Sequence, residues 1–231
     1  MDEAAAGLDA LSWSWRRRGR IATRLWWQAA RLGLTTYPLY RDRIKSWDVW
    51  RAVHHCRATL AAGDPVYDVG AWQSEVSWAL RQAGFSRLAG CDTDPRVVRM
   101  PGARPIRYVA ADFFDVDLAP ASLGAITCLS VIEHGVDVEA FLERCARALR
   151  RDGRMLITTD YWPEPVGTDG LDAFGRSWHV FSRSDAEALI ATASRHGLEP
   201  DGPVSLEARD APIAWNNRHY TFLWLAFRNT R

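Results

Sequence analysis

The stretch Val66-Tyr67-Asp68-Val69-Gly70, followed by Ala71-Trp72-Gln73-Ser74, sets the fold class of this chain. An apolar run ends at a glycine, and a helix-patterned segment begins directly after it. An open α/β sheet forms a nucleotide pocket in this way, because glycine lets the backbone approach a ligand and the helix N-terminus presents N–H groups. A single glycine at such a turn also occurs for packing alone. Other segments of the sequence are therefore needed to distinguish a ligand-binding turn from one that serves packing alone.

Composition narrows the class of protein. The 231 residues suit one domain with an extension, and the hydrophobic fraction of 48% is ordinary for a globular chain. A net charge of +1 gives no electrostatic reason to expect a nucleic-acid partner. The four cysteines are widely spaced, and neither a secretory segment nor an apolar run of about 18 residues is present. We expect a cytoplasmic protein with reduced cysteines, no membrane span and no nucleic-acid partner.

Residues 1–62 are expected to form a helical extension before the sheet. Seven of the twelve tryptophans fall in the first third of the chain. Apolar residues at helical spacing predict helices over 21–34 and 44–62. The basic and aromatic stretch 13–20 is interpreted as a solvated face with tryptophan packed inward, with contact to nucleic acid or an anionic membrane as the alternative. The predicted domains are thus 1–62 and 63–231, and the extension is a lid or an interface.

From Pro65 onward, strand and helix patterns alternate, which predicts a mostly parallel, doubly wound α/β sheet. A turn at Asp152-Gly153 leads into the fifth strand, and Ser182 is expected to cap the last helix. A loop covers 160–180, and 198–217 is irregular with one short strand. The expected strands are 65–69, 87–92, 106–110, 123–130, 154–159 and 220–227, and the expected helices are 73–84, 137–150 and 182–196, with a short helix or turn at 95–100.

Three carboxylates favour the ligand-binding interpretation. Asp68 precedes the glycine turn, Asp92 ends the second strand, and Asp112 follows the third. Ligands of open α/β sheets bind outside the carboxyl ends of the strands. Asp92 is placed to accept ribose hydroxyls, and Asp112 with Phe113 is placed to take an adenine amino group and base. Each aspartate alone would more often cap a turn or helix, but all three occur in order at strand ends.

These segments resemble class I S-adenosylmethionine-dependent methyltransferases over about residues 60–228. The matching segments are Asp68-Val69-Gly70, Gly90-Cys91-Asp92, Ala110-Ala111-Asp112-Phe113, Leu129-Ser130-Val131-Ile132-Glu133-His134, Arg150–Ile157 and Tyr220–Leu225. The resemblance implies a Rossmann-like, seven-stranded, mostly parallel sheet with an antiparallel last strand and helices on both faces. It also implies S-adenosylmethionine as cofactor, held by Asp68, Gly70, Ala71, Trp72, Ser74, Asp92, Thr93, Asp112, Phe113 and Ser130.

The glycine loop departs from the family's usual pattern. Trp72 and Ser74 stand where later glycines of a dinucleotide fingerprint would lie, which disfavours a dinucleotide enzyme. We expect a stiff loop in which Gly70 and Asp68 hold the methionine end of the cofactor.

Methyl transfer to a hydroxyl or ammonium requires an aligned nucleophile and removal of a proton. His134 and His179 are the candidate bases, and Glu133 is the third catalytic candidate, although each could serve only to shape the pocket. A metal site is not expected, because Ser130 stands where some related methyltransferases have a second acid. The loop from Tyr161 through Trp178 is predicted to wall the acceptor site, with Tyr161, Trp162, Trp178 and His54 as substrate contacts. Asp160, Tyr161 and Glu164 are further candidates for the base.

The sequence therefore predicts a methyltransferase that acts on a hydroxyl of a small molecule or sugar in natural-product or saccharide biosynthesis. N-methylation of a small molecule or peptide natural product is the first alternative. A non-catalytic binding partner with the same fold is the second, and RNA methylation is disfavoured by the near-neutral charge. A small-molecule acceptor is the expected partner, and a homodimer is compatible with the sequence.

Overall fold

The computed structural model describes residues 45–100 and 106–231, together with the single positions Gly7, Leu25, Gln28, Ala29, Leu32 and Leu34. The chain divides into two compact units, Met1–Asp117 and Leu118–Arg231. The predictions for the stretch 13–20 and for most of the helix 21–34 lie outside the described residues. The boundary expected after residue 62 stays a prediction.

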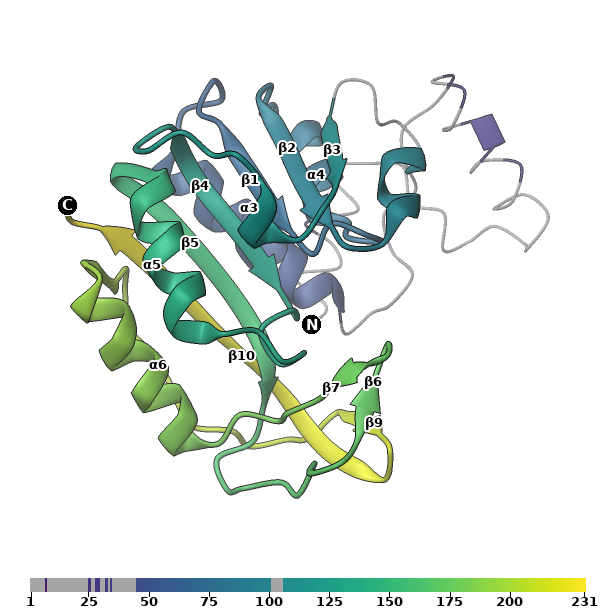
Figure 1. Ribbon diagram of the computed structural model, residues 1–231, viewed down its shortest axis with the longest axis vertical. Coiled ribbons are helices and arrows are strands. Elements are labelled where there is room, and N and C mark those ends of the chain that lie inside the picture. The colour runs from purple at the N-terminus through teal and green to yellow at the C-terminus, as the bar shows by residue number, and fades with distance from the viewer. Residues whose placement is uncertain are drawn as a thin grey trace. The chain divides into compact units, whose positions relative to one another are not determined.

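The first unit contains a parallel sheet in the order β3-β2-β1 (Figure 1). β1 is buried along its whole length, as expected for an apolar strand of a parallel sheet. Helices α3 and α4 contact each other, and α3 confirms the helix predicted over 44–62. The elements are α3 Lys45–Thr59, β1 Val66–Val69, α4 Val76–Gln82, β2 Leu88–Asp92, the 3-10 helices η1 Pro95–Arg99 and η2 Phe113–Asp115, and β3 Arg107–Ala110.

Helix α4 begins three residues later than the sequence predicted. Ser74 N–H donates to Ala71 O at 3.1 Å, and Gln73 has a φ of 60°, so the backbone makes a turn before the helix starts. At the other end, Gly84 has a φ of 100° and terminates the helix as predicted. The delay places a non-helical loop, rather than the first turn of a helix, directly after Gly70.

The second unit contains strands in the order β4-β5-β10-β8, with β9 paired to β10. β4 and β5 are parallel, whereas β10 is antiparallel to β5, which confirms the predicted antiparallel last strand. Helices α5 and α6 lie side by side (Figure 1). The elements are β4 Leu123–Leu129, α5 Val138–Ala148, β5 Leu149–Tyr161, β6 Asp172–Ala173, β7 Arg176–Ser177, α6 Arg183–Arg195, β8 Leu198–Pro200, β9 Ile213–Trp215 and β10 Arg218–Asn229.

Three local predictions in the second unit need correction. β5 runs through the predicted Asp152-Gly153 turn without ending there. The pairing of β5 with β4 shifts in register at this point, and Asp152 has a positive φ of 59°. The predicted loop 160–180 contains the β6–β7 hairpin. The segment 198–217 contains two short strands where one was predicted, because β10 is long enough to pair with both.

Side-chain caps fix the helices of the second unit. Ser182 and Asp185 form the predicted capping box at the start of α6, and Asp137 accepts from Ala140 N–H at the start of α5. Asn229, at the end of β10, donates its side-chain amide to the carbonyl oxygens of Ala146 and Leu149 at 3.0 and 2.8 Å. No helix in the described part of the chain is long and apolar enough to cross a bilayer.

Candidate active site

The predicted methionine loop in the first unit is tied to the neighbouring strand. Gly70 and Ala71 both donate their backbone N–H groups to Cys91 O, at 3.0 and 2.9 Å. Gly70 has a φ of 75°, a conformation that glycine adopts without strain. Gly90 lies against the same loop, and a Cβ on it would be 2.7 Å from Asp68 O. The ends of β1 and β2 therefore leave no room for a side chain at Gly90.

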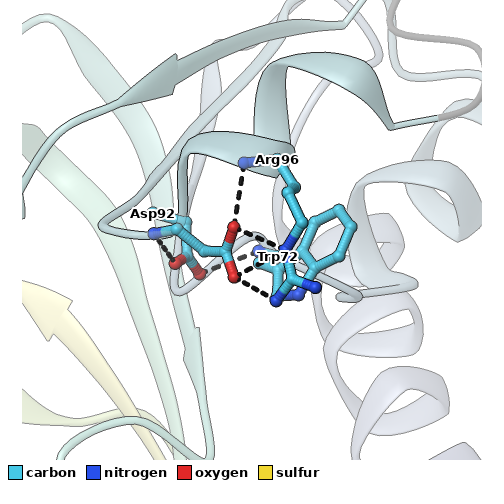
Figure 2. Close-up of polar contacts among 4 residues, drawn as sticks. Trp72, Asp92 and Arg96 are labelled. Atoms are coloured by element: carbon cyan, nitrogen blue, oxygen red, sulfur yellow. Dashed lines mark hydrogen bonds and ion pairs between the residues drawn. The ribbon is translucent and has the colours of Figure 1, made fainter.

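Asp92, the predicted ribose acid, organises the loop (Figure 2). One carboxylate oxygen accepts Trp72 N–H at 2.8 Å, and the other accepts Asp94 N–H at 2.7 Å. Arg96 lies over the Trp72 ring, with its guanidinium carbon 4.8 Å from the ring centre, and its Nε donates to Asp94 at 2.9 Å. A carboxylate offers about four acceptor sites, so Asp92 keeps acceptor capacity for ribose hydroxyls.

Asp112 and Phe113 follow β3 as the sequence predicted. Asp112 Oδ1 accepts Phe114 N–H at 3.0 Å, and the buried Phe113 ring lies 6.5 Å from the Tyr67 ring. Burial raises the pKa of the Tyr67 hydroxyl above its ordinary value, and burial raises the pKa of the Cys91 thiol to about 12. Both groups stay neutral at physiological pH.

Of the other predicted cofactor contacts, Ala71 is fully buried and Ser74 Oγ accepts Val76 N–H at 3.4 Å before α4. Thr93 lies between the two acids of the β2–η1 connection. The donors and acceptors of this unit fit S-adenosylmethionine chemically: acids for the ribose and adenine, and a glycine turn for close approach of the backbone. The assignment of each contact stays a prediction.

Glu133 and the two candidate bases come together in the second unit. Ser130, directly after β4, has a φ of 55° and donates its N–H to Thr158 O at 2.9 Å. Glu133 is buried, and its Oε2 accepts Thr159 Oγ1–H at 3.1 Å. His179 N–H donates to Glu133 O at 2.9 Å, so His179 lies next to the segment that carries His134.

A pocket of about 600 Å³ lies beside this segment in the second unit. Its wall includes three of the predicted residues, Glu133, Trp178 and His179, together with one face of α6. His134, Tyr161 and Trp162 do not line it. The volume lies within the range of small-molecule sites.

His179 is paired with a carboxylate on the pocket wall. Its Nε2 lies 3.1 Å from Asp185 Oδ2, and the two side chains are 52% and 40% exposed. Burial raises the pKa of Asp185, but hydrogen bonds from Ser182 and His179 outweigh that effect and leave the pKa below its ordinary value. Asp185 was predicted only as a helix cap, and its spacing of six residues from His179 gave no further signal.

His134 lies in a different environment. Its ring meets the Phe174 ring edge-on at 5.6 Å, and Phe174 is stacked on Trp215 at 6.4 Å. The two aromatic residues come from the turn of the β6–β7 hairpin and from β9. The sequence included Phe174 in the predicted acceptor wall but gave no reason to place Trp215 beside it.

The predicted substrate contacts differ in how much surface they offer. The Tyr161 side chain is 1% exposed, and its hydroxyl donates to Leu206 O at 2.7 Å. Trp178 is 3% exposed and donates Nε1–H to Asp160 Oδ2 at 2.8 Å. Trp162 packs against the buried cluster that contains Trp178, and His54, on α3 in the first unit, lies 5.9 Å from the Trp50 ring. Their roles toward a substrate stay predictions.

No group of three or more potential metal-ligating side chains occurs among residues 45–100 and 106–231 or the described single positions.

Comparisons with known proteins agree with this architecture. Residues 67–157 match a family model described as a methyltransferase domain. The ubiquinone biosynthesis O-methyltransferase of Idiomarina loihiensis is 30% identical over 105 residues, which are 42% of this chain and 42% of that protein. The match thus spans less than half the length of that curated relative.

Solved structures show the same fold at low identity. A geranyl diphosphate methyltransferase in complex with SAM has a TM-score of 0.62 and 14% identity, covering 78% of this chain and 84% of its own. The Burkholderia thailandensis 1,6-didemethyltoxoflavin-N1-methyltransferase, with bound 1,6-didemethyltoxoflavin and S-adenosylhomocysteine, has a TM-score of 0.60 and 17% identity, covering 91% of this chain and 88% of its own.

The fold is therefore the Rossmann-like α/β fold of methyltransferases, as the strand-end acids predicted. The match of residues 67–157 to a methyltransferase domain supports the predicted class I S-adenosylmethionine-dependent methyltransferase, and S-adenosylmethionine is the cofactor of that class. The comparisons support the predicted family and cofactor, and the predicted α/β fold class is confirmed, although β1–β5 and β8–β10 make eight strands in the two units where seven were predicted.

Proposed function

We propose that this protein transfers the methyl group of S-adenosylmethionine to a hydroxyl of a small molecule. One observation carries the proposal: in the second unit, His134 follows Glu133 directly, and the backbone N–H of His179 donates to the carbonyl oxygen of Glu133 at 2.9 Å, so the segments that carry the two predicted bases are joined. Imidazole titrates near neutral pH and suits removal of a hydroxyl proton. The O-methyltransferase that matches part of the chain supports the same acceptor atom.

The cofactor supplies the electrophilic methyl carbon, and the residues of this chain have three tasks. Asp92 and Asp112 hold the nucleoside part in the first unit. One of the two histidines accepts the proton of the acceptor hydroxyl, and Asp185 orients the ring of His179 through its bond to Nε2. The buried carboxylate of Glu133, held by Thr159, fixes the segment that carries His134 and accepts the backbone N–H of His179.

The biological setting belongs to the same proposal. A natural-product or saccharide pathway is supported only by the aromatic character of the predicted acceptor wall. A cytoplasmic location and a homodimer are the accompanying expectations, and light scattering of the purified protein tests the latter.

The experiment measures release of S-adenosylhomocysteine from purified protein given S-adenosylmethionine and a panel of phenols, sugars and matched amines. We expect turnover with a hydroxyl acceptor, and a loss of about 100-fold or more in kcat for His134→Ala or His179→Ala. The matched control is His219→Ala, since His219 lies exposed on β10 and does not line the pocket. Its kcat should stay within about twofold.

Each alternative has its own result. Turnover of amines alone would replace the proposal with N-methylation. If isothermal titration detects neither S-adenosylmethionine nor S-adenosylhomocysteine, the protein is a non-catalytic module. If both histidine variants keep full turnover and cofactor affinity, neither histidine is the base.

A further inference from the structure

Two exposed aromatic side chains of the second unit form a stacked pair beside His134. Of the large apolar side chains exposed in the described part of the chain, Phe114, Phe174 and Trp215 are aromatic, and the last two contact each other. Phe174 is 87% exposed and Trp215 is 47% exposed, with their rings inclined by only 20°. Apolar rings of this size are normally buried, so their joint exposure on one patch calls for a ligand or partner.

The backbone holds Phe174 in a conformation that its side chain disfavours. Phe174 and Gly175 join Ala173 to its partner Arg176 and have φ values of 57° and 75°. Positive φ at both central positions is the type I′ pattern, which favours asparagine followed by glycine. A bulky residue there is an outlier. Strain of this kind persists mainly at functional sites.

The β9–β10 hairpin has the same kind of turn, but with residues that suit its backbone. Asn216 and Asn217 join Trp215 to Arg218 with φ values of 47° and 56°, and asparagine adopts this conformation readily. The β9–β10 turn therefore uses residues suited to its backbone, whereas the β6–β7 turn has an aromatic residue at its first position. The aromatic ring, rather than the turn, is the feature that needs explanation.

The Phe174–Trp215 pair lies next to His134, one of the two candidate bases. The His134 ring contacts Phe174 edge-on at 5.6 Å, with an angle of 84° between the rings. Neither Phe174 nor Trp215 lines the 600 Å³ pocket. A ring stacked on this pair would lie close to one of the two candidate bases, which is where an acceptor hydroxyl has to be.

We propose that Phe174 and Trp215 form a stacking platform for a planar aromatic ring of the acceptor, so that the substrate class is phenolic. This inference rests on the proposed function for the reaction, but the binding step stands without it. Flat rings gain offset stacking against both side chains, whereas a saturated ring of the same size gains less contact and no stacking.

The test uses naphthalene-2,3-diol as the planar probe and decalin-2,3-diol as its saturated counterpart. Binding to the full chain is followed by ligand-observed NMR, which needs no turnover, and methyl transfer is measured separately. Two variants remove a ring, Phe174→Asn and Trp215→Ala. Phe174→Asn introduces a residue that the turn favours, so the hairpin keeps its backbone. Two matched variants keep a ring, Phe174→Tyr and Trp215→Phe.

We expect the planar probe to bind wild-type protein at least fivefold more tightly than the saturated one. The ring-removing variants should weaken its binding at least fivefold, and the ring-keeping variants less than twofold. Equal binding of the two probes, no binding of the planar probe, tighter binding of a sugar, or an unchanged affinity in Phe174→Asn would each overturn the platform. If binding follows this pattern but no hydroxyl is methylated, the platform stands and the proposed reaction fails. Methylation of a hydroxyl that is insensitive to the loss of either ring would overturn the platform and leave the proposed reaction in place.

Discussion

Replacement of Gly90 by alanine tests how closely the β1 loop is packed on β2. The new Cβ would lie 2.7 Å from Asp68 O, 3.0 Å from Ala71 Cβ and 3.2 Å from Asp68 Cβ. The first contact is with a backbone atom and the other two are with the first side-chain atom, so no neighbouring side chain can rotate away. The loop itself has to move.

The size of the effect follows from two opposing contributions. Inserting a methyl group into a packed region costs about 1–3 kcal/mol. Alanine recovers roughly 0.5–1 kcal/mol, because glycine loses more conformational freedom in a strand. The net loss therefore lies between roughly 0 and 2.5 kcal/mol and is centred near about 1 kcal/mol, and each kcal/mol lowers Tm by roughly 2–4 °C for a chain of this length.

Cofactor affinity should fall together with stability. Asp92 lies two residues after Gly90 and holds Trp72 N–H, and Ala71 is bonded to Cys91 O. A displaced loop changes both contacts, so we expect affinity for S-adenosylmethionine to fall about tenfold. Calorimetric titration measures the affinity, and thermal unfolding measures the stability.

The matched control is Gly63→Ala in the same unit. A Cβ at Gly63 would meet no heavy atom within 4 Å, so its stability should change by less than about 0.5 kcal/mol. If Gly90→Ala behaves like Gly63→Ala in both measurements, the loop is not tightly packed on β2 and the reasoning fails.

Four further outcomes follow from buried or capped groups. Ser182→Ala should cost about 1 kcal/mol in urea unfolding because it removes the α6 cap, and Ser182→Thr should retain most of that energy. Asn229→Leu leaves two buried carbonyl oxygens without their donor and should cost about 1–3 kcal/mol, a loss contradicted by an unchanged urea midpoint. Burial raises the pKa of the Cys56 and Cys91 thiols to about 12, so iodoacetamide at about pH 8 should label them only in denaturant; labelling of native protein would contradict their burial. The folded pKa of Asp185 lies below its unfolded value of about 3.9. Its stabilisation is therefore present above that pH and is lost as pH falls through the folded pKa, so the advantage of wild type over Asp185→Asn should shrink as the pH falls below about 4.

Local patterns made most of the described fold predictable. Alternating strand and helix patterns predicted the five parallel strands and α5, and the Ser182–Asp185 spacing predicted the cap of α6. The start of α4 was predicted too early because the turn at Gln73 requires a positive φ that its residue type does not announce. The β6–β7 hairpin was missed because each strand has two residues, too few to show alternation.

The candidate site was predictable to the extent that it depends on strand ends. Asp92 ends β2 and Asp112 follows β3 as predicted, since an acid at the end of a strand can be identified from one segment alone. Two contacts of the second unit join segments far apart in sequence: Tyr161 with Leu206, and Phe174 with Trp215. Nothing local in the sequence encodes such pairs, because they depend on how a long loop packs onto β10.

The departure of the β1 loop from a glycine-rich pattern has a physical consequence. The sequence predicts a stiff loop in which Gly70 and Asp68 hold the methionine end of the cofactor. Its contacts support stiffness by another route, because three successive N–H groups, those of Gly70, Ala71 and Trp72, donate to β2 residues. The Trp72 N–H goes to Asp92, the acid predicted to accept the ribose. Loop order and ribose binding then depend on the same carboxylate. Protonation or removal of Asp92 should therefore loosen the loop and also weaken cofactor binding. Substitution of Asp92 alone cannot separate these two effects.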